Sequence, residues 1–301
     1  MEQPLVTVIV VSYNHSRYIR ENLDSIKNQT YTNIQLIVGD DASPDNSADV
    51  IEQWLKETQY PAERNFHTNN TGLATMLNEC IDLAKGKYIK LIAADDFMHP
   101  EAIEKSVSLL ESLGDEYGMA FSNTHTVDDN GSIIGDISNY DSVKGMDPHT
   151  FKRELLKENR IPALTVLLKT DVIKETGKYD TKLIVEDYFR WLKISEKYLI
   201  AYIPEKLAYY RRHPENLSKI KAERIEMEVL LLQMMFDKDG ILKDKINSRT
   251  HRYYLFGKLF DEYSHAYSAY PYRTKRLDIA IRNKLPTLLY KIINKIAELK
   301  M

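Results

Sequence analysis

The sequence predicts an α/β fold with a mainly parallel central sheet flanked by helices, followed by a helical C-terminal extension. Strand-length apolar runs alternate with segments of helical periodicity through roughly the first 100 residues. These runs are almost continuously apolar and β-branched, as expected of parallel strands that are covered on both faces. After about residue 220 the pattern is helical and rich in Tyr, Met and Leu. The alternation indicates βαβ units, and the last part indicates a separate helical segment.

The first third of the chain contains three predicted strands and four predicted helices. The run LVTVIVVSYN is a predicted strand, and the segment after it has helical spacing. The run IQLIVGDD is a second strand, and Ser43-Pro44-Asp45 signals the start of a helix. A third helix is expected over residues 72–84, closed by Gly86 as a left-handed cap. Residues 88–94 are the next strand, and a Pro-Glu pair begins the helix after it.

The second half is less regular. DDNGSI is typical of a hairpin turn. IPALTVLLKTDVIKETGKYD predicts a strand and then a helix that ends at Gly177, and VEDYFRWLKISEKY predicts another helix. LIAYIPEKLAYYRRH predicts two short strands that are broken at Pro204. The final LPTLLYKIINKIAELK is an amphipathic helix.

The composition is that of a soluble globular protein, with 43% hydrophobic and 28% charged residues. The apolar runs are too short for a transmembrane helix, and no basic-then-apolar leader follows Met1. Cys80 is the single cysteine and lies among apolar residues at helical spacing, which favours a buried structural thiol. These features predict a cytoplasmic protein.

The net charge of −3 conceals an asymmetry. Residues 221–301 carry 16 Lys and Arg against 10 Asp and Glu, a net of +6, so that the rest of the chain is acidic. A basic C-terminal segment suits a weakly anionic surface or an acidic partner. The acidic body argues against nucleic-acid binding there.

Three polar loops follow three of the predicted strands: Ser12-Tyr13-Asn14, residues 40–43 and Asp95-Asp96. In parallel sheets, ligands bind beyond the carboxyl ends of the strands. The loops contain no Gly-rich phosphate-binding motif, which disfavours a dinucleotide site or a P-loop. An Asp pair can hold Mg²⁺ or Mn²⁺ together with substrate phosphates. For an isolated pair a turn or a helix cap is the favoured explanation. Three polar loops on the same sheet edge shift the balance toward a metal site.

Several stretches together resemble glycosyltransferase family 2. VTVIVVSYNHSRYIRENLDSIKNQTYTNIQLIVGDDASPDNS is similar to the family's opening, and NNTGLATMLNECIDLAKGKYIKLIAADDFMHP to its next block. GKYDTKLIVEDYFRWLKISEK and YYRRHPENLS resemble its later segments. The resemblance spans roughly residues 5–218 and implies the GT-A fold.

The resemblance also implies a division of the chain. Residues 1–218 would be the GT-A domain, with a nucleotide-binding part (1–100) and an acceptor-binding part (101–218). Residues 219–301 would be a helical C-terminal extension.

By this resemblance, five residues belong to the nucleotide and metal site. Tyr13 matches the residue that lies beside the base, and Asp41 matches the carboxylate that bonds the base, with Asp40 next to it. Asp95 and Asp96 match the carboxylates that bind the metal and the sugar nucleotide, and Asp96 is the one expected to coordinate directly. The implied cofactor is Mn²⁺ or Mg²⁺.

Four further residues match the reaction and diphosphate positions. Asp187 matches the catalytic base of inverting members, and Glu186 lies beside it. Arg211 and His213 fall where the family places residues near the diphosphate or acceptor. Asp187 alone would also be explained as an acid favoured by a helix N-terminus.

The chain departs from the family pattern at four positions. Ala93 replaces the first Asp of the usual D-A-D-D, and Leu77 replaces an Arg. Ala42 stands in place of a Gly, and Val11 in place of a Pro. We therefore expect the metal to be held by fewer protein ligands than usual.

The expected function is transfer of a sugar, as a hexosyl- or N-acetylhexosaminyltransferase, from a nucleotide donor (UDP-linked by family prevalence) with inversion. The acceptor is expected to be a hydroxyl of a saccharide or a lipid-linked saccharide in cell-surface polysaccharide or glycolipid assembly. Two alternatives stay open: a catalytically silent sugar-nucleotide-binding module, and a nucleotidyltransferase, for which SYNHSRYIR lacks the Gly-rich basic loop.

The Tyr-rich stretch HRYYLFGKLFDEYSHAYSAYPYR is expected to form core or interface in preference to a sugar platform. The last helix is expected to pack on the domain or pair with a second subunit, in preference to lying on anionic lipid at the inner face of the membrane, because its apolar stripe is short.

Overall fold

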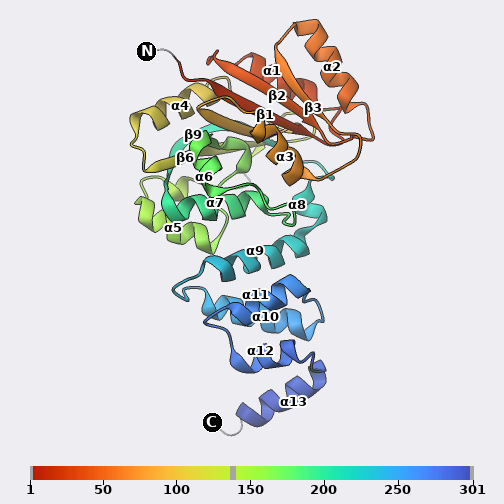
Figure 1. Ribbon diagram of the computed structural model, residues 1–301, viewed down its shortest axis with the longest axis vertical. Helices are drawn as coiled ribbons and strands as arrows, with labels where there is room; N and C mark the ends of the chain where they lie inside the picture. Colours follow the sequence, from red (N-terminus) through yellow and green to blue (C-terminus); the bar gives the residue numbers. More distant parts are fainter. Residues whose placement is uncertain (1–2, 136–139, 299–301) are drawn as a thin grey trace. The chain divides into compact units, whose positions relative to one another are not determined.

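The computed structural model describes residues 3–135 and 140–298. The chain forms two compact units, residues 1–219 and 220–301 (Figure 1). The first unit is an α/β layer structure, and the second is helical.

The first unit is built on one nine-stranded sheet, in the order β3-β2-β1-β4-β8-β6-β9-β5, with β7 paired to β6. β1 to β4 are parallel to one another, β8 is antiparallel to β4 and β6, and β9 is parallel to β6. The sheet therefore has a parallel half and a mixed half. The strands are β1 (Val6–Ser12), β2 (Ile34–Asp40), β3 (Ala62–Phe66), β4 (Tyr88–Ala93), β5 (Phe97–Met98), β6 (Tyr117–Val127), β7 (Ile133–Gly135), β8 (Leu167–Lys169) and β9 (Leu199–Arg211).

Helices pack against this sheet and complete its core (Figure 1). One core cluster joins buried side chains of β1, β2 and β4 with those of α1, α2 and α4, including Val8, Leu36 and Trp54. The helices are α1 (Ile19–Lys27), α2 (Ser47–Thr58), α3 (Leu73–Asp82), α4 (Ala102–Ser112), α5 (Pro148–Lys157), α6 (Thr170–Thr176) and α7 (Glu186–Lys197), with 3₁₀ turns η1 (Tyr140–Val143) and η2 (Ala163–Thr165). The predicted fold class is confirmed.

The predicted break at Pro204 is wrong, because β9 is one continuous strand from Leu199 to Arg211. Its register against β6 shifts at this point: Ser122 pairs with Ile203, and Asn123 pairs with Lys206. The extra residues on β9 form an irregularity that accommodates a proline, which has no N–H for the ladder.

Gly86 does not form the predicted helix cap. Helix α3 ends at Asp82, and Gly86 lies outside the left-handed region. A Cβ at this position would lie 2.6 Å from the backbone nitrogen of Thr7 and 2.8 Å from the carbonyl oxygen of Leu5. Glycine is therefore required because the loop before β4 passes directly against β1.

Up to residue 298, where the described part of the chain ends, the second unit consists of five helices, preceded by α8 (Leu217–Ile220) at the boundary. Tyr263, Tyr267 and Tyr270 are at most 1% exposed, so the Tyr-rich stretch forms core, as predicted. None of the described helices is both long enough and apolar enough to cross a membrane. The five helices are α9 (Ala222–Phe236), α10 (Lys243–Leu255), α11 (Asp261–Ala269), α12 (Lys275–Arg282) and α13 (Thr287–Glu298).

Candidate active site

The three polar loops predicted from the sequence lie side by side. β1 is flanked by β2 and β4, and all three run parallel, so their carboxyl ends meet at one edge of the sheet. Backbone hydrogen bonds join the loops: the Asp41 N–H donates to the Ser12 carbonyl (3.0 Å), and the Ala94 N–H donates to the Val11 carbonyl (3.0 Å).

Asp40 and Asp41 hold the loop after β2 in shape. Asp40 accepts hydrogen bonds from the Ser43 backbone N–H (2.9 Å) and hydroxyl (2.6 Å). Asp41 bonds the ring of His67 (2.8 Å) and accepts the backbone N–H groups of Thr71 (2.8 Å) and the residue after it (2.7 Å). Burial by itself would raise the pKa of Asp41, but these hydrogen bonds lower the pKa below its usual value. The base contact predicted for both carboxylates stays a prediction.

Tyr13 lies on an exposed turn beside them. Its side chain is 46% exposed, and the Asn14 N–H after it donates to the Ser43 hydroxyl (2.9 Å). Ala42 has φ +57°, the left-handed region that favours glycine, at the position where the family usually has Gly. The loop after β2 thus adopts a conformation that costs a residue with a Cβ some free energy. Tyr13 is accessible for stacking on a base.

A group of three potential metal ligands comes from three different loops. His15 follows β1, Asp95 follows β4 and His213 follows β9. His213 Nε2 lies 3.0 Å from Asp95 Oδ2, and His15 Nε2 lies 3.9 Å from the same oxygen. One ligand atom from each residue lies within 4.8 Å of the others. We call these three residues the His-Asp-His cluster.

The polar atoms of this cluster fit a bound cation. Asp95 Oδ1 and the Nδ1 atoms of His15 and His213 are buried without a hydrogen-bond partner among the described residues. The Asn216 amide nitrogen lies 3.1 Å from His213 Nε2 and also donates to the Arg211 carbonyl. His213 Nε2 and Asp95 Oδ2 are two potential ligand atoms only 3.0 Å apart, an arrangement that a cation bound to both would stabilise. Two imidazoles with one carboxylate suit a transition metal such as Mn²⁺ better than Mg²⁺, which prefers oxygen ligands.

Asp96, the residue expected to coordinate directly, lies outside the His-Asp-His cluster. Its carboxylate accepts the backbone N–H of Arg211 (2.8 Å) and is buried. Burial and the neighbouring Asp95 raise the pKa of Asp96 well above its usual value. The geometry therefore favours Asp95 over Asp96 as a metal ligand.

Arg211 is 1% exposed, and its guanidinium is engaged inside the protein. Its Nε donates to the Asp95 carbonyl (2.9 Å), and one terminal nitrogen donates to the two carbonyls of residues 128–129 (3.1 Å each). The other terminal nitrogen bonds the carboxylate of Glu21. Arg211 thus fixes the Asp95-Asp96 loop against the hairpin turn, and the diphosphate contact expected of it stays a prediction.

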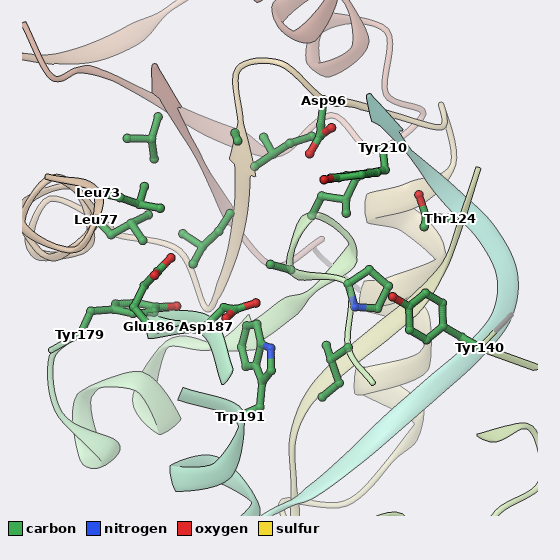
Figure 2. A pocket seen from close by; sticks show the side chains of 18 of the residues that line it. Leu73, Leu77, Asp96, Thr124, Tyr140, Tyr179, Glu186, Asp187, Trp191 and Tyr210 are labelled. Atoms are coloured by element: carbon green, nitrogen blue, oxygen red, sulfur yellow. The ribbon is translucent and has the colours of Figure 1, made fainter. Parts of the chain in front are cut away.

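A cavity of about 410 Å³ lies between these loops and helix α7. Figure 2 shows Asp96 on one side of it and Glu186 and Asp187 on another. Ala93 and Leu77, two of the departures from the family pattern, also line it. The remaining wall is largely apolar and includes Leu73, Leu91, Ile161, Pro162, Tyr179 and Trp191.

Asp187 has few polar contacts at the cavity wall. It lies in the first turn of α7, where one carboxylate oxygen accepts the next backbone N–H and the other lies 3.3 Å from the Asn159 amide. Burial raises the pKa of Asp187 above its usual value. A carboxylate with a raised pKa beside a cavity has the chemistry of a general base.

Sequence reasoning missed two residues of this site, His15 and Trp191. Trp191 lines the cavity, and its indole N–H is buried without a hydrogen-bond partner among the described residues. It lies four residues after Asp187 and therefore on the same face of α7, a spacing that the sequence shows. His15 is two residues beyond Tyr13, in a loop already singled out.

The comparisons with known proteins show the family of the chain. The model of the family described as "Glycosyl transferase family 2" matches residues 7–165. An uncharacterized glycosyltransferase of Methanocaldococcus jannaschii is 30% identical over 238 residues, which cover 75% of this chain and 77% of that protein. An uncharacterized glycosyltransferase of Rickettsia bellii is 31% identical over 229 residues. The matched region is 75% of this chain but only 33% of that protein.

Solved structures match along most of the chain. S. aureus TarS 1-349 in complex with UDP-GlcNAc has a TM-score of 0.69 at 18% identity, covering 91% of this chain and 83% of that one. The mannosyltransferase PcManGT from Pyrobaculum calidifontis, in complex with GDP-Man and Mn²⁺, has a TM-score of 0.60 at 18% identity. The match covers 99% of this chain and 81% of that one. At this identity the likeness shows the fold, which is the GT-A fold predicted from the sequence.

Proposed function

Because the chain belongs to glycosyl transferase family 2 and is a glycosyltransferase, we propose that it uses a nucleoside diphosphate sugar, with a UDP-sugar as the first candidate. The sugar, a hexose or N-acetylhexosamine, goes to a hydroxyl of a saccharide or lipid-linked saccharide with inversion at the anomeric carbon. The product belongs to cell-surface polysaccharide or glycolipid assembly at the cytoplasmic face of the membrane. The nucleotide sugars bound by TarS and PcManGT support the donor class.

The observation that carries this proposal is the shared cavity. Asp96, beside the His-Asp-His cluster, and Asp187 at the start of α7 line the same space. A donor whose diphosphate lies at the cluster can therefore present its sugar toward Asp187. Holding two reactants in one cavity supplies the positional part of the rate.

In the proposed reaction Asp187 is the general base. An acceptor oxygen attacks the anomeric carbon, and Asp187 takes the proton of that hydroxyl as the new bond forms. The bond from the anomeric carbon to the diphosphate oxygen breaks, and its electron pair leaves with the nucleoside diphosphate. The Trp191 N–H can donate to a sugar hydroxyl in the cavity, since it has no partner among the described residues.

His15, Asp95 and His213 are the residues that would hold a divalent cation. When bound, such a cation supplies positive charge that neutralises the departing diphosphate. Tyr13 and Asp41 contribute the base contacts, with Asp40 shaping their loop. Residues 1–100 then form the nucleotide-binding part and residues 101–218 the acceptor-binding part. Arg211 and His213 belong to the diphosphate end, and Glu186, beside Asp187 on α7, belongs to the acceptor end.

Thermal unfolding tests this proposal. We expect one of UDP, GDP, CMP and TDP, or a sugar conjugate of one of them, to raise the melting temperature in the presence of Mn²⁺ but not of EDTA. Slow hydrolysis of that donor should be lost in Asp187→Asn while stabilisation by the nucleotide is kept. If no nucleotide stabilises the protein with metal, the proposal fails.

The silent-module alternative is kept because Ala93 and Leu77 both line the cavity in place of charged family residues. It predicts metal-dependent nucleotide binding with no donor hydrolysis by the unmodified chain. The same assay therefore separates the two readings.

A further inference from the structure

Helix α13 exposes a continuous apolar face. Five large aliphatic side chains on this helix are between 42% and 70% exposed. At about 100° per residue they fall within one half of the helix circumference. We call these residues the α13 apolar face: Leu288, Leu289, Ile292, Ile293 and Ile296.

The contacts of α13 within its own unit leave this face uncovered. Tyr290 is the only buried side chain among those described in the helix. Its ring packs edge-on against Tyr254 (5.1 Å between centroids) and His251 (5.5 Å) of α10. Tyr290 lies at one margin of the apolar half of the helix, so docking through it orients α13 without covering the middle of the face.

The opposite margin of the apolar face is basic. Lys291 and Lys295 are exposed and lie beside Leu288 on the helix circumference, and Lys284 is exposed just before the helix. After Tyr270 the chain carries eight Lys and Arg against two acidic residues. One of these acids, Asp278, is 2% exposed and paired with Arg273 and Arg282. The surface around α13 is therefore positive.

We propose that α13 binds the surface of an anionic phospholipid bilayer, with its apolar face among the acyl chains and its lysines at the level of the phosphates. An amphipathic helix of this kind lies in the interface plane, and juxtaposed Lys residues are attracted to anionic lipid. A second copy of the chain is a poorer partner than an anionic surface, because its surface around α13 is itself positive. The proposal goes beyond sugar transfer and does not depend on it.

Co-sedimentation with large unilamellar vesicles tests this surface with the full chain. We expect binding to vesicles of 70:30 phosphatidylcholine:phosphatidylglycerol at least about tenfold stronger than to phosphatidylcholine alone. Raising the salt concentration to about 0.5 M should weaken binding, because the lysine attraction is screened. Equal binding to both vesicle types, or none to either, would overturn the proposal.

Two variants separate the apolar and the basic contributions. Leu288→Ser/Ile292→Ser/Ile296→Ser should abolish binding, and Lys291→Glu/Lys295→Glu should reduce it at least about fivefold on anionic vesicles only. Ile133→Ser/Ile134→Ser is the matched control, since these residues of β7 are also more than half exposed, and it should bind like the unmodified chain. Unchanged melting temperature and nucleotide stabilisation establish that each variant is folded.

Sedimentation velocity tests whether a second copy of the chain, and not a lipid bilayer, covers the α13 apolar face. A concentration-dependent dimer that the apolar-face variant abolishes, together with no vesicle binding, would show that a second copy covers α13 and would contradict the proposal. A monomer at all concentrations with vesicle binding supports it.

Discussion

The two acidic ends of the cavity are held in very different ways. At the loop end, Asp95 and Asp96 are tied to the end of β9 and the loop after it. His213, in that loop, bonds the Asp95 carboxylate, and Arg211, the last residue of β9, bonds the Asp95 carbonyl and the Asp96 carboxylate. At the helix end, Asp187 has one amide neighbour at 3.3 Å and the N–H of the next residue. The loop end is a rigid polar network, and the helix end is a lightly held carboxylate in an apolar wall.

The rigid loop end suits the binding of a cation and a diphosphate, and the lightly held Asp187 suits general-base catalysis. A cation and a diphosphate need fixed ligands whose positions do not depend on the reaction step. A general base has to change its protonation state, and each additional hydrogen bond to the carboxylate would lower its pKa and its basicity. The five predictions below test this division of work, from the largest expected effect to the smallest.

Asp187→Asn should reduce the transfer rate by about 10²–10⁴-fold, because the amide cannot take the acceptor proton. Nucleotide-dependent stabilisation should be unchanged, because Asp187 belongs to the helix end. Steady-state kinetics and thermal unfolding measure the two effects. Loss of nucleotide binding in this variant would show that the two ends are not separate.

Arg211→Met should lower the free energy of unfolding by about 2–4 kcal/mol, because several buried carbonyls lose their donor. Urea denaturation measures the change. Arg212→Met is the matched control. The Arg212 side chain, next to Arg211 in the sequence, is exposed, so its replacement should change the free energy of unfolding by less than about 0.5 kcal/mol. Equal effects of the two substitutions would contradict the structural role of Arg211.

His15→Ala should weaken Mn²⁺ binding at least about tenfold, roughly 1.4 kcal/mol, because one of three protein ligands is removed. Titration of Mn²⁺ followed by electron paramagnetic resonance measures the affinity, with UDP present. His149→Ala, at an exposed position, is the control. If His15→Ala binds Mn²⁺ normally, the ion is held by the carboxylates without His15.

The acid limb of the pH–rate profile should lie above the pH range in which an ordinary aspartate titrates. The pKa of Asp187 is raised by burial, and a base acts only when ionised, so the rate should rise with pH through that raised value. The pKa of Asp96 is also raised, so Asp96→Asn serves as the comparison. If the acid limb persists in Asp96→Asn, it reports the ionisation of Asp187 at the helix end. If the limb disappears in this variant, it reports the ionisation of Asp96 at the loop end.

Ala42→Gly should stabilise the protein by about 0.5–1 kcal/mol, because Ala42 occupies the left-handed region at φ +57°. Ala48→Gly, in helix α2, should destabilise it by a similar amount. If Ala42 is strained, thermal unfolding of the two single variants should show a higher melting temperature for Ala42→Gly and a lower one for Ala48→Gly. A lower melting temperature for both variants would mean that the loop after β2 carries no such strain.

Three of the four strands in the parallel half, β1, β2 and β4, could be predicted from local patterns. They are mostly apolar because both faces are covered, and each is followed by a polar loop. The fourth, β3, was missed because its sequence AERNF is largely polar. The mixed half could not be predicted in this way, because β9 lies between β6 and β5 and its pairing joins residues about 80 positions apart. The wrong break at Pro204 has the same origin, since only the register against β6 shows how the proline is accommodated.

At the site, the sequence alone determined the residue types and the loops that carry them. An acidic pair after β4, a polar turn after β1 and an acid at the start of α7 are local features with helical or strand spacing. Only the tertiary structure decided which of them meet. The neighbours Asp95 and Asp96 make different contacts, so that one joins His15 and His213 while the other accepts the Arg211 N–H. That choice depends on where the end of β9 passes across the loops, and a contact between residues more than 100 positions apart leaves no periodic signal in the sequence.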